Sequence, residues 1–186
     1  MHRRLFLSVM AAGLAASAFP GLAQAAKQNR RAPYRGAEMV YLDTYERPGT
    51  VIVDTHARAL YHVMGDGEAM RYGVAVGKDG FSWAGIAQIG RKTEWPRWTP
   101  PASMIKRRPE LAKFANGMPG GRPDNPLGAR ALYLFANGRD TLFRIHGTNE
   151  PQSIGTAASS GCIRMLNEEV TELYERVTIG TKVIVL

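Results

Sequence analysis

Short runs of β-forming residues, each closed by turn formers, occupy most of the chain beyond Gly49 and limit it to a fold built largely from strands. Gly65, Asp66 and Gly67 form one such break, and Asn137 with Gly138 is a pair favoured in tight hairpins. The second break would place His146 at a strand end. Strands are therefore expected over residues 50–53, 59–63, 70–76, 85–92, 131–135, 141–146 and 182–186.

Helical signals are fewer. Asn167, as an N-cap, precedes Glu168 and Glu169, and apolar residues follow at three-and-four spacing through Val170 and Leu173. This pattern predicts a helix that starts just after the only cysteine. A shorter helix over residues 103–108 would stop at Pro109. The Trp- and Pro-rich stretch 95–101 and residues 117–128 are expected to be ordered loops that shape a cleft.

The first 25 residues are typical of a cleavable secretory signal. Arg3 and Arg4 precede an apolar stretch, and Ala23 and Ala25 form a small-residue cleavage site. The apolar stretch is short for a bilayer crossing, so we expect no transmembrane segment in the mature chain. The paired arginines also resemble a twin-arginine signal, so the sequence predicts export to the periplasm by that route or the general secretory route. Residues 26–48, polar at their start, are expected to be a flexible lead-in to a domain over residues 49–186.

Basic residues outnumber acidic ones by 24 to 16, and the excess persists without Arg3 and Arg4. It favours an anionic partner. The basic residues are scattered and form no dense run, and export conflicts with nucleic-acid binding, so we expect none. His56 and His62 have no Cys, Asp or Glu at ligand-like spacing, so no metal site is predicted.

Cys162 is the only cysteine, which in an exported protein indicates a reactive thiol or a disulfide between molecules. His146 lies 16 positions ahead of it. A thiol of pKa about 8.5 needs a neighbouring base to attack near neutral pH, and an imidazole is such a base. Glycines at 147, 155 and 161 would let the chain fold back. Main-chain N–H groups of Gly161 and Cys162 are the candidate oxyanion donors.

The string from His146-Gly147-Thr148 to Ser159-Ser160-Gly161-Cys162-Ile163-Arg164-Met165 resembles the active-site signature of the L,D-transpeptidase (YkuD) family, in the subgroup with a Gly-Cys-Ile-Arg-Met nucleophile motif. The resemblance extends over about residues 49–186. Ser160 departs from it, because many members have His there.

The resemblance implies a mainly β, sandwich-like domain with one or two short helices and no cofactor. It implies that Cys162 attacks the bond between meso-diaminopimelate and the terminal D-Ala of a peptidoglycan tetrapeptide stem and forms a thioester. A second stem as acceptor would give a 3-3 crosslink, and a wall-attached lipoprotein would become tethered. Water would make the enzyme an L,D-carboxypeptidase or endopeptidase.

Further residues are assigned roles from their chemistry and position, and the family suggests the role of Gly147. His146 would be the general base and acid, oriented by a main-chain carbonyl near Gly147. Arg164 would grip a substrate carboxylate, or else pair with Glu168 or Glu169. Ser159 would bond within the turn, steady His146 or, with Ser160, contact substrate. Trp95 and Trp98 would line the cleft, or else belong to the core.

Overall fold

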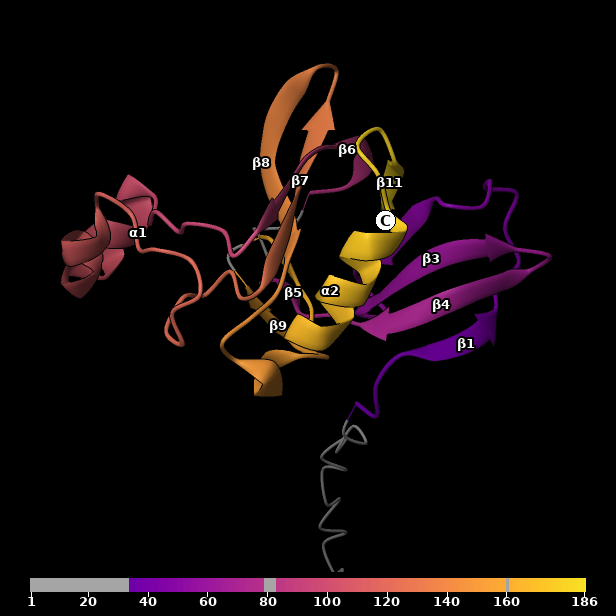
Figure 1. Ribbon diagram of the computed structural model, residues 1–186, viewed down its shortest axis with the longest axis horizontal. Helices are drawn as coiled ribbons and strands as arrows, with labels where there is room; N and C mark the ends of the chain where they lie inside the picture. The colour runs from indigo at the N-terminus through magenta and orange to yellow at the C-terminus, as the bar shows by residue number, and fades with distance from the viewer. Residues whose placement is uncertain (1–33, 79–82, 160) are drawn as a thin grey trace, which may run out of the picture. The chain divides into compact units, whose positions relative to one another are not determined.

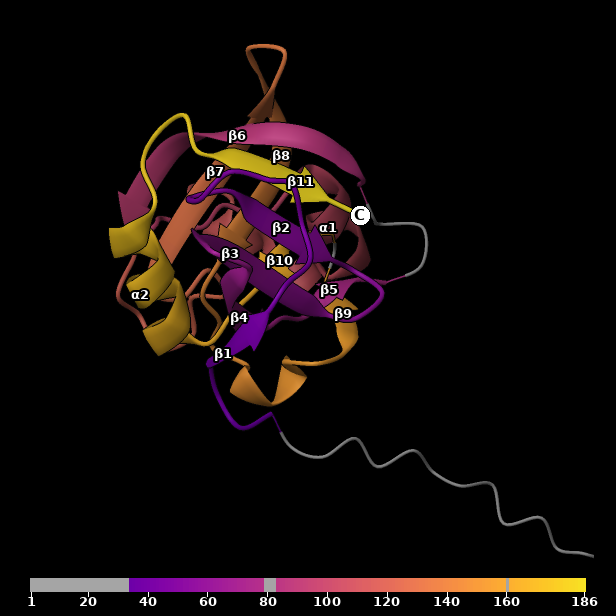
Figure 2. The same ribbon diagram turned by 90° about the vertical axis from the view of Figure 1, so that its right-hand side faces the viewer.

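Nine strands form one curved sheet in the computed structural model (Figures 1 and 2), which describes residues 34–78, 83–159 and 161–186. In spatial order the strands are β1 (Glu38–Tyr41), β4 (Glu68–Gly73), β3 (Ala59–Gly65), β2 (Val51–Asp54), β11 (Lys182–Val185), β6 (Gly85–Glu94), β7 (Arg130–Ala136), β8 (Arg139–His146) and β10 (Ile163–Arg164). A two-stranded sheet joins β5 (Val76–Gly77) to β9 (Ala157–Ser159). The helices are α1 (Ala102–Arg107) and α2 (Asn167–Arg176), with 3-10 turns η1 (Pro109–Phe114) and η2 (Pro151–Ser153). The mainly β prediction is confirmed.

One apolar cluster joins both halves of the sheet to α2. Alternate residues of β2 and β7, such as Val51 and Leu132, are fully buried in it. Val170 and Leu173 of α2 add one apolar helix face, and α2 packs on β7 and β8. Each fully buried aliphatic side chain contributes about 1.5–3 kcal/mol to the stability of such a core. The cluster therefore fixes α2, and with it the segment just before α2, against the sheet.

The sheet closes on itself beside β10. Ala75, just after β4, forms an antiparallel bridge with Arg164. The Ala75 N–H donates to the Arg164 carbonyl at 2.9 Å, and the Arg164 N–H donates to the Ala75 carbonyl at 2.8 Å. On its other side β10 runs parallel to β8. The short strand is thus held between two partners, which is more support than two residues at a sheet edge would have.

Residues 34–48 differ from the predicted flexible lead-in. Glu38–Tyr41 forms β1 and pairs with β4, and the Tyr34 hydroxyl donates to Glu169 of α2 at 2.8 Å. Nζ of Lys182, on β11, forms an ion pair with the Glu46 carboxylate at 2.8 Å. The apolar residues of β1 are largely exposed, so a burial-based pattern gave no signal for this strand.

The beginning of α2 also differs from the prediction. Asn167 is the first helical residue and Leu166 is the cap, without a side-chain hydrogen bond. The Asn167 amide is used elsewhere: Oδ1 accepts the N–H groups of Ala129 (3.0 Å) and Thr148 (3.1 Å), and Nδ2 donates to the Thr148 carbonyl at 2.9 Å. Asn167 therefore ties α2 to the loops that flank β7 and β8.

Several sequence expectations lie outside the described residues, namely the secretory signal, the first part of the lead-in and Ser160. Within the described ranges, no helix has the length and apolar character needed to cross a membrane.

His62 gives a prediction about stability. Its side chain is buried on β3, and neither ring nitrogen has a partner among the described residues. Burial lowers the pKa of His62 below 6.5, and the nearby Arg176 lowers it further. Below pH 6.5 the unfolded chain therefore binds more protons at His62 than the folded chain does. The free energy of unfolding then decreases as the pH is lowered.

We expect His62→Leu to leave the free energy of unfolding unchanged at pH 7.5 or raise it by about 1 kcal/mol, with a larger gain at pH 5.5, because an unpaired buried group is removed. Urea unfolding at both pH values measures this. His56→Leu, at an exposed position of the β2–β3 turn, is the matched control and should show no such pH-dependent gain. A loss of more than about 1 kcal/mol at both pH values would contradict the prediction.

Candidate active site

The register of two strands brings the histidine and the cysteine together. In the parallel pair of β8 and β10, Arg164 lies opposite His146 and Ile163 opposite Ile145. Continued by one residue, this register places Cys162 beside Arg144. Because side chains alternate between the faces of a strand, His146 and Cys162 project from the same face of adjacent strands.

The same two charged residues act on both groups. The charges of both Arg144 and Arg164 act on the His146 ring and on the Cys162 thiol. Two groups that share the same pair of charged neighbours lie in one small region. Cys162 as a whole residue is partly exposed.

A main-chain carbonyl fixes the tautomer of His146. Nδ1 lies 2.6 Å from the Gly147 carbonyl oxygen. A carbonyl only accepts, so Nδ1 carries the proton and donates it, which leaves Nε2 with a free lone pair. The ring is therefore oriented and ready to take a proton at Nε2.

Burial keeps both groups neutral in the resting protein. It lowers the pKa of His146 to about 4, against the Gly147 hydrogen bond that raises it, and the charges of Arg164 and Arg144 lower it further. Burial also raises the pKa of Cys162, although the Arg144 main-chain N–H and the same two guanidinium groups oppose this shift. The resting pair is thus a thiol and a neutral imidazole, not a thiolate–imidazolium pair.

The turn before Cys162 is held by Ser159. The buried Ser159 hydroxyl donates to the Cys162 carbonyl at 2.5 Å and accepts the Gly161 N–H at 3.1 Å. Gly161 has φ 118°, a conformation that favours glycine. The structure therefore differs from the expected oxyanion role of Gly161, because its N–H is already bonded. The Cys162 N–H donates to no described residue.

The remaining predicted site residues are placed as follows. Arg164 pairs with Glu150 at 2.7 Å, not with Glu168 or Glu169. Trp95 is 55% exposed and packs near the Arg130 guanidinium, so it is not a core residue. Trp98 is half-buried and contacts Phe114 of η1, with a main-chain bridge to Met118. The two tryptophans lie in the excursion between β6 and β7.

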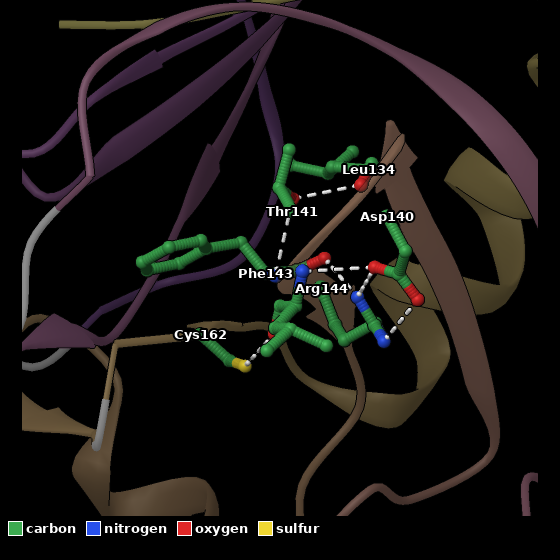
Figure 3. Close-up of polar contacts among 7 residues, drawn as sticks. Leu134, Asp140, Thr141, Phe143, Arg144 and Cys162 are labelled. Carbon is green, nitrogen blue, oxygen red and sulfur yellow. Dashed lines mark hydrogen bonds and ion pairs between the residues drawn. The ribbon is translucent and has the colours of Figure 1, made fainter. Parts of the chain in front are cut away.

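Two features near the site are not predicted from the sequence. The Asn167 amide holds both main-chain groups of Thr148, directly after the Gly147 carbonyl that orients His146. The second feature is an irregularity in β8 over residues 140–144 (Figure 3), which places the Leu142 carbonyl 4.0 Å from the Cys162 sulfur.

Comparison with known proteins agrees with this geometry. The YkuD family, described as the L,D-transpeptidase catalytic domain, matches residues 48–185. A putative L,D-transpeptidase of Fuscovulum blasticum is 34% identical over 96% of both chains. The probable L,D-transpeptidase YbiS of Escherichia coli is 34% identical over 78% of this chain, which spans 46% of YbiS.

Solved structures share the fold. A Brucella melitensis protein described as a probable carnitine operon oxidoreductase is 49% identical, with a TM-score of 0.58 over 86% of this chain and 99% of that one. An L,D-transpeptidase from Mycobacterium smegmatis has a TM-score of 0.55 at 18% identity, over 74% of this chain and 58% of that one. The name of the Brucella protein denotes another chemistry. The family match over most of the chain and the curated relatives agree with each other, and the chain belongs to the YkuD family of L,D-transpeptidase catalytic domains.

Proposed function

We propose that this protein is an exported L,D-transpeptidase that acts on peptidoglycan tetrapeptide stems through a thioester on Cys162. The observation that carries the proposal is the parallel pairing of β8 with β10, which sets an oriented, neutral imidazole and the thiol of a partly exposed cysteine on one face. Nucleophile, base and base-orienting group are the parts that thiol acyl transfer requires.

The first half of the reaction forms the acyl-enzyme. The Cys162 proton passes to Nε2 of His146 as the sulfur attacks the carbonyl carbon of the stem's diaminopimelate residue. The carbonyl π electrons move to oxygen, and the Cys162 N–H is the donor available for that oxyanion. When the C–N bond to D-Ala breaks, His146 returns the proton to the leaving amine, and a thioester remains.

Loss of one oxyanion donor costs other enzymes about 3 kcal/mol, so this N–H would matter about as much as the base. The Gly161 N–H could join it only if its hydrogen bond to Ser159 opened.

The second half transfers the acyl group to an amine. His146 takes a proton from the acceptor amine, the new C–N bond forms, and the sulfur leaves and regains its proton. An amine of a second stem gives a 3-3 crosslink, and an amine of a wall-attached lipoprotein gives a tethered protein. Water would give hydrolysis, which is the alternative function, an L,D-carboxypeptidase or endopeptidase.

Location follows from the same proposal. The substrate is assembled outside the cytoplasmic membrane, and the start of the sequence has the pattern of a secretory signal. We therefore place the mature protein in the periplasm.

Removal of the thiol should abolish the reaction. With purified tetrapeptide muropeptides, Cys162→Ala should lose product by about a thousandfold or more, and His146→Ala by a similar factor, because nucleophile and base act as a unit. The parent protein incubated with a carbapenem should gain one covalent adduct by intact mass, and Cys162→Ala none.

His56→Ala, exposed on the β2–β3 turn, is the control and should retain full activity. If folded Cys162→Ala formed crosslinks at the rate of the parent protein, the proposed mechanism would be excluded. Product analysis with and without an added amine acceptor separates transfer from hydrolysis.

The pH dependence of kcat/KM tests the state of the base. His146 must be neutral to accept a proton, and its pKa of about 4 lies below the usual 6.5. We expect kcat/KM to stay level between about pH 7 and about pH 5 and to fall only as the pH approaches 4. An acid limb near pH 6.5 would show that the ring is not desolvated during catalysis. Circular dichroism at each pH separates this limb from unfolding.

A further inference from the structure

An irregular segment of β8 lies beside the nucleophile. Tyr133 of β7 is opposite Arg144, but Phe135 is opposite Asp140, so one residue of β7 faces three of β8. Leu142, in the middle of these three, has φ 65° and a side chain that is 75% exposed. A leucine rarely adopts this left-handed conformation, and such backbone persists only where the surroundings hold it. We call residues 140–144 the β8 bulge.

The Asp140 carboxylate holds the β8 bulge from within (Figure 3). Its Oδ1 accepts the Leu142 N–H at 2.8 Å and Nη1 of Arg144 at 2.7 Å, and its Oδ2 accepts Nη2 of Arg144 at 2.8 Å. Burial would raise the pKa of Asp140, but these bonds lower it below its ordinary value. The carboxylate therefore stays charged while it bridges the middle and the end of the β8 bulge.

A second anchor and an aromatic ring complete the support. The Thr141 hydroxyl donates to the Leu134 carbonyl at 2.7 Å and accepts the Phe143 N–H at 3.2 Å. The Arg144 guanidinium lies 4.4 Å from the centre of the Tyr133 ring. These contacts hold the turn in its irregular conformation.

The β8 bulge presents two main-chain groups of opposite kind to the Cys162 sulfur. The Leu142 carbonyl accepts the S–H at 4.0 Å. The register of β8 and β10, continued by one residue, places Arg144 beside Cys162, and the Arg144 N–H lowers the pKa of the thiol. A carbonyl suits a thiol and an N–H suits a thiolate, so the two groups match the two states through which the sulfur passes. The other charged or titratable groups around the sulfur are His146 and the Arg144 guanidinium on β8, and Arg164 on β10 with its partner Glu150.

We propose that the β8 bulge is a positioning device for the nucleophile and that Asp140 is the positioning residue that maintains it. The inference rests on the proposed role of Cys162. In the resting protein the Leu142 carbonyl directs the S–H. When the proton moves to Nε2 of His146, the Arg144 N–H is the main-chain group left to face the charged sulfur. Asp140 touches no reacting atom and acts through the backbone it holds.

Asp140→Ala and Asp140→Asn test the proposal. We expect the rate of Cys162 alkylation by iodoacetamide at pH 7 to fall about tenfold in Asp140→Ala, with its pH profile shifted upward, because the Arg144 N–H is no longer held at the sulfur. Asp140→Asn should lose about threefold, since an amide oxygen still accepts the Leu142 N–H. With tetrapeptide muropeptides, kcat should fall by similar factors while KM changes less than about twofold.

The matched control is Glu38→Gln, which removes the carboxylate charge from another strand-borne ion pair, Glu38 with Arg71 at 2.8 Å on β1 and β4. It should leave alkylation and kcat unchanged. Melting temperatures identify any variant that fails to fold. If Asp140→Ala is such a variant, Asp140→Asn alone decides.

Two results would overturn the inference. Parent-like alkylation and kcat in Asp140→Asn would show that the β8 bulge does not depend on this carboxylate. Faster alkylation would show that Asp140 acts only as a nearby negative charge, whose loss favours the thiolate. These outcomes differ from failure of the proposed function, in which Cys162→Ala itself would retain activity.

Discussion

The two hydrogen bonds between Ala75 and Arg164, together with the parallel pairing of β10 and β8, are the constraint on which the site depends. A two-residue strand with one neighbour would fray, because few main-chain bonds hold it. Here it lies between the end of β4 and the end of β8. The bond from the Met165 N–H to the His146 carbonyl, at 2.8 Å, extends that hold by one residue. Cys162, immediately before β10, thus takes its position from backbone contacts with segments far away in the sequence.

Desolvation then decides the chemistry that this position allows. His146, buried to 4% exposure, resists protonation, and the thiol of the partly exposed Cys162 is desolvated enough to resist ionisation. The pKa of His146 is lowered and that of Cys162 is raised, and both shifts favour the neutral pair. A resting thiol is less open to oxidation than a thiolate, because the thiolate is the form that oxidants attack. The cost is that the sulfur must be activated at the moment of attack. The Gly147 carbonyl, by fixing the Nδ1–H tautomer, supplies that activation without adding a charged residue.

The strands and α2 could be predicted from the sequence because their apolar residues alternate or repeat at helical spacing. β2, β7 and α2 are examples, and their buried faces form the core. Cys162 and His146 could be proposed as site residues from their residue types and flanking glycines. Strand β1 could not be predicted, since its apolar side chains are exposed and its place is set by pairing with β4. Nor could the β8 bulge be predicted, because left-handed backbone at a leucine has no local preference behind it. The hydrogen bonds that Asp140 and Thr141 make within the turn are visible only in the structure.

Gly147 shows how a correct observation can carry the wrong physical reason. From the sequence, this glycine is expected to give freedom to a returning loop. In the structure its φ is not in the left-handed region, and an added Cβ would lie 2.2 Å from Oδ1 of Asn167 and 2.9 Å from the Ala129 main-chain nitrogen. The missing side chain lets the Asn167 amide reach Thr148 and Ala129. Gly147 is therefore needed for close packing, and the same packing fixes the residue whose carbonyl orients His146. The first residue of α2 and His146, the proposed base, are thereby parts of one hydrogen-bonded arrangement.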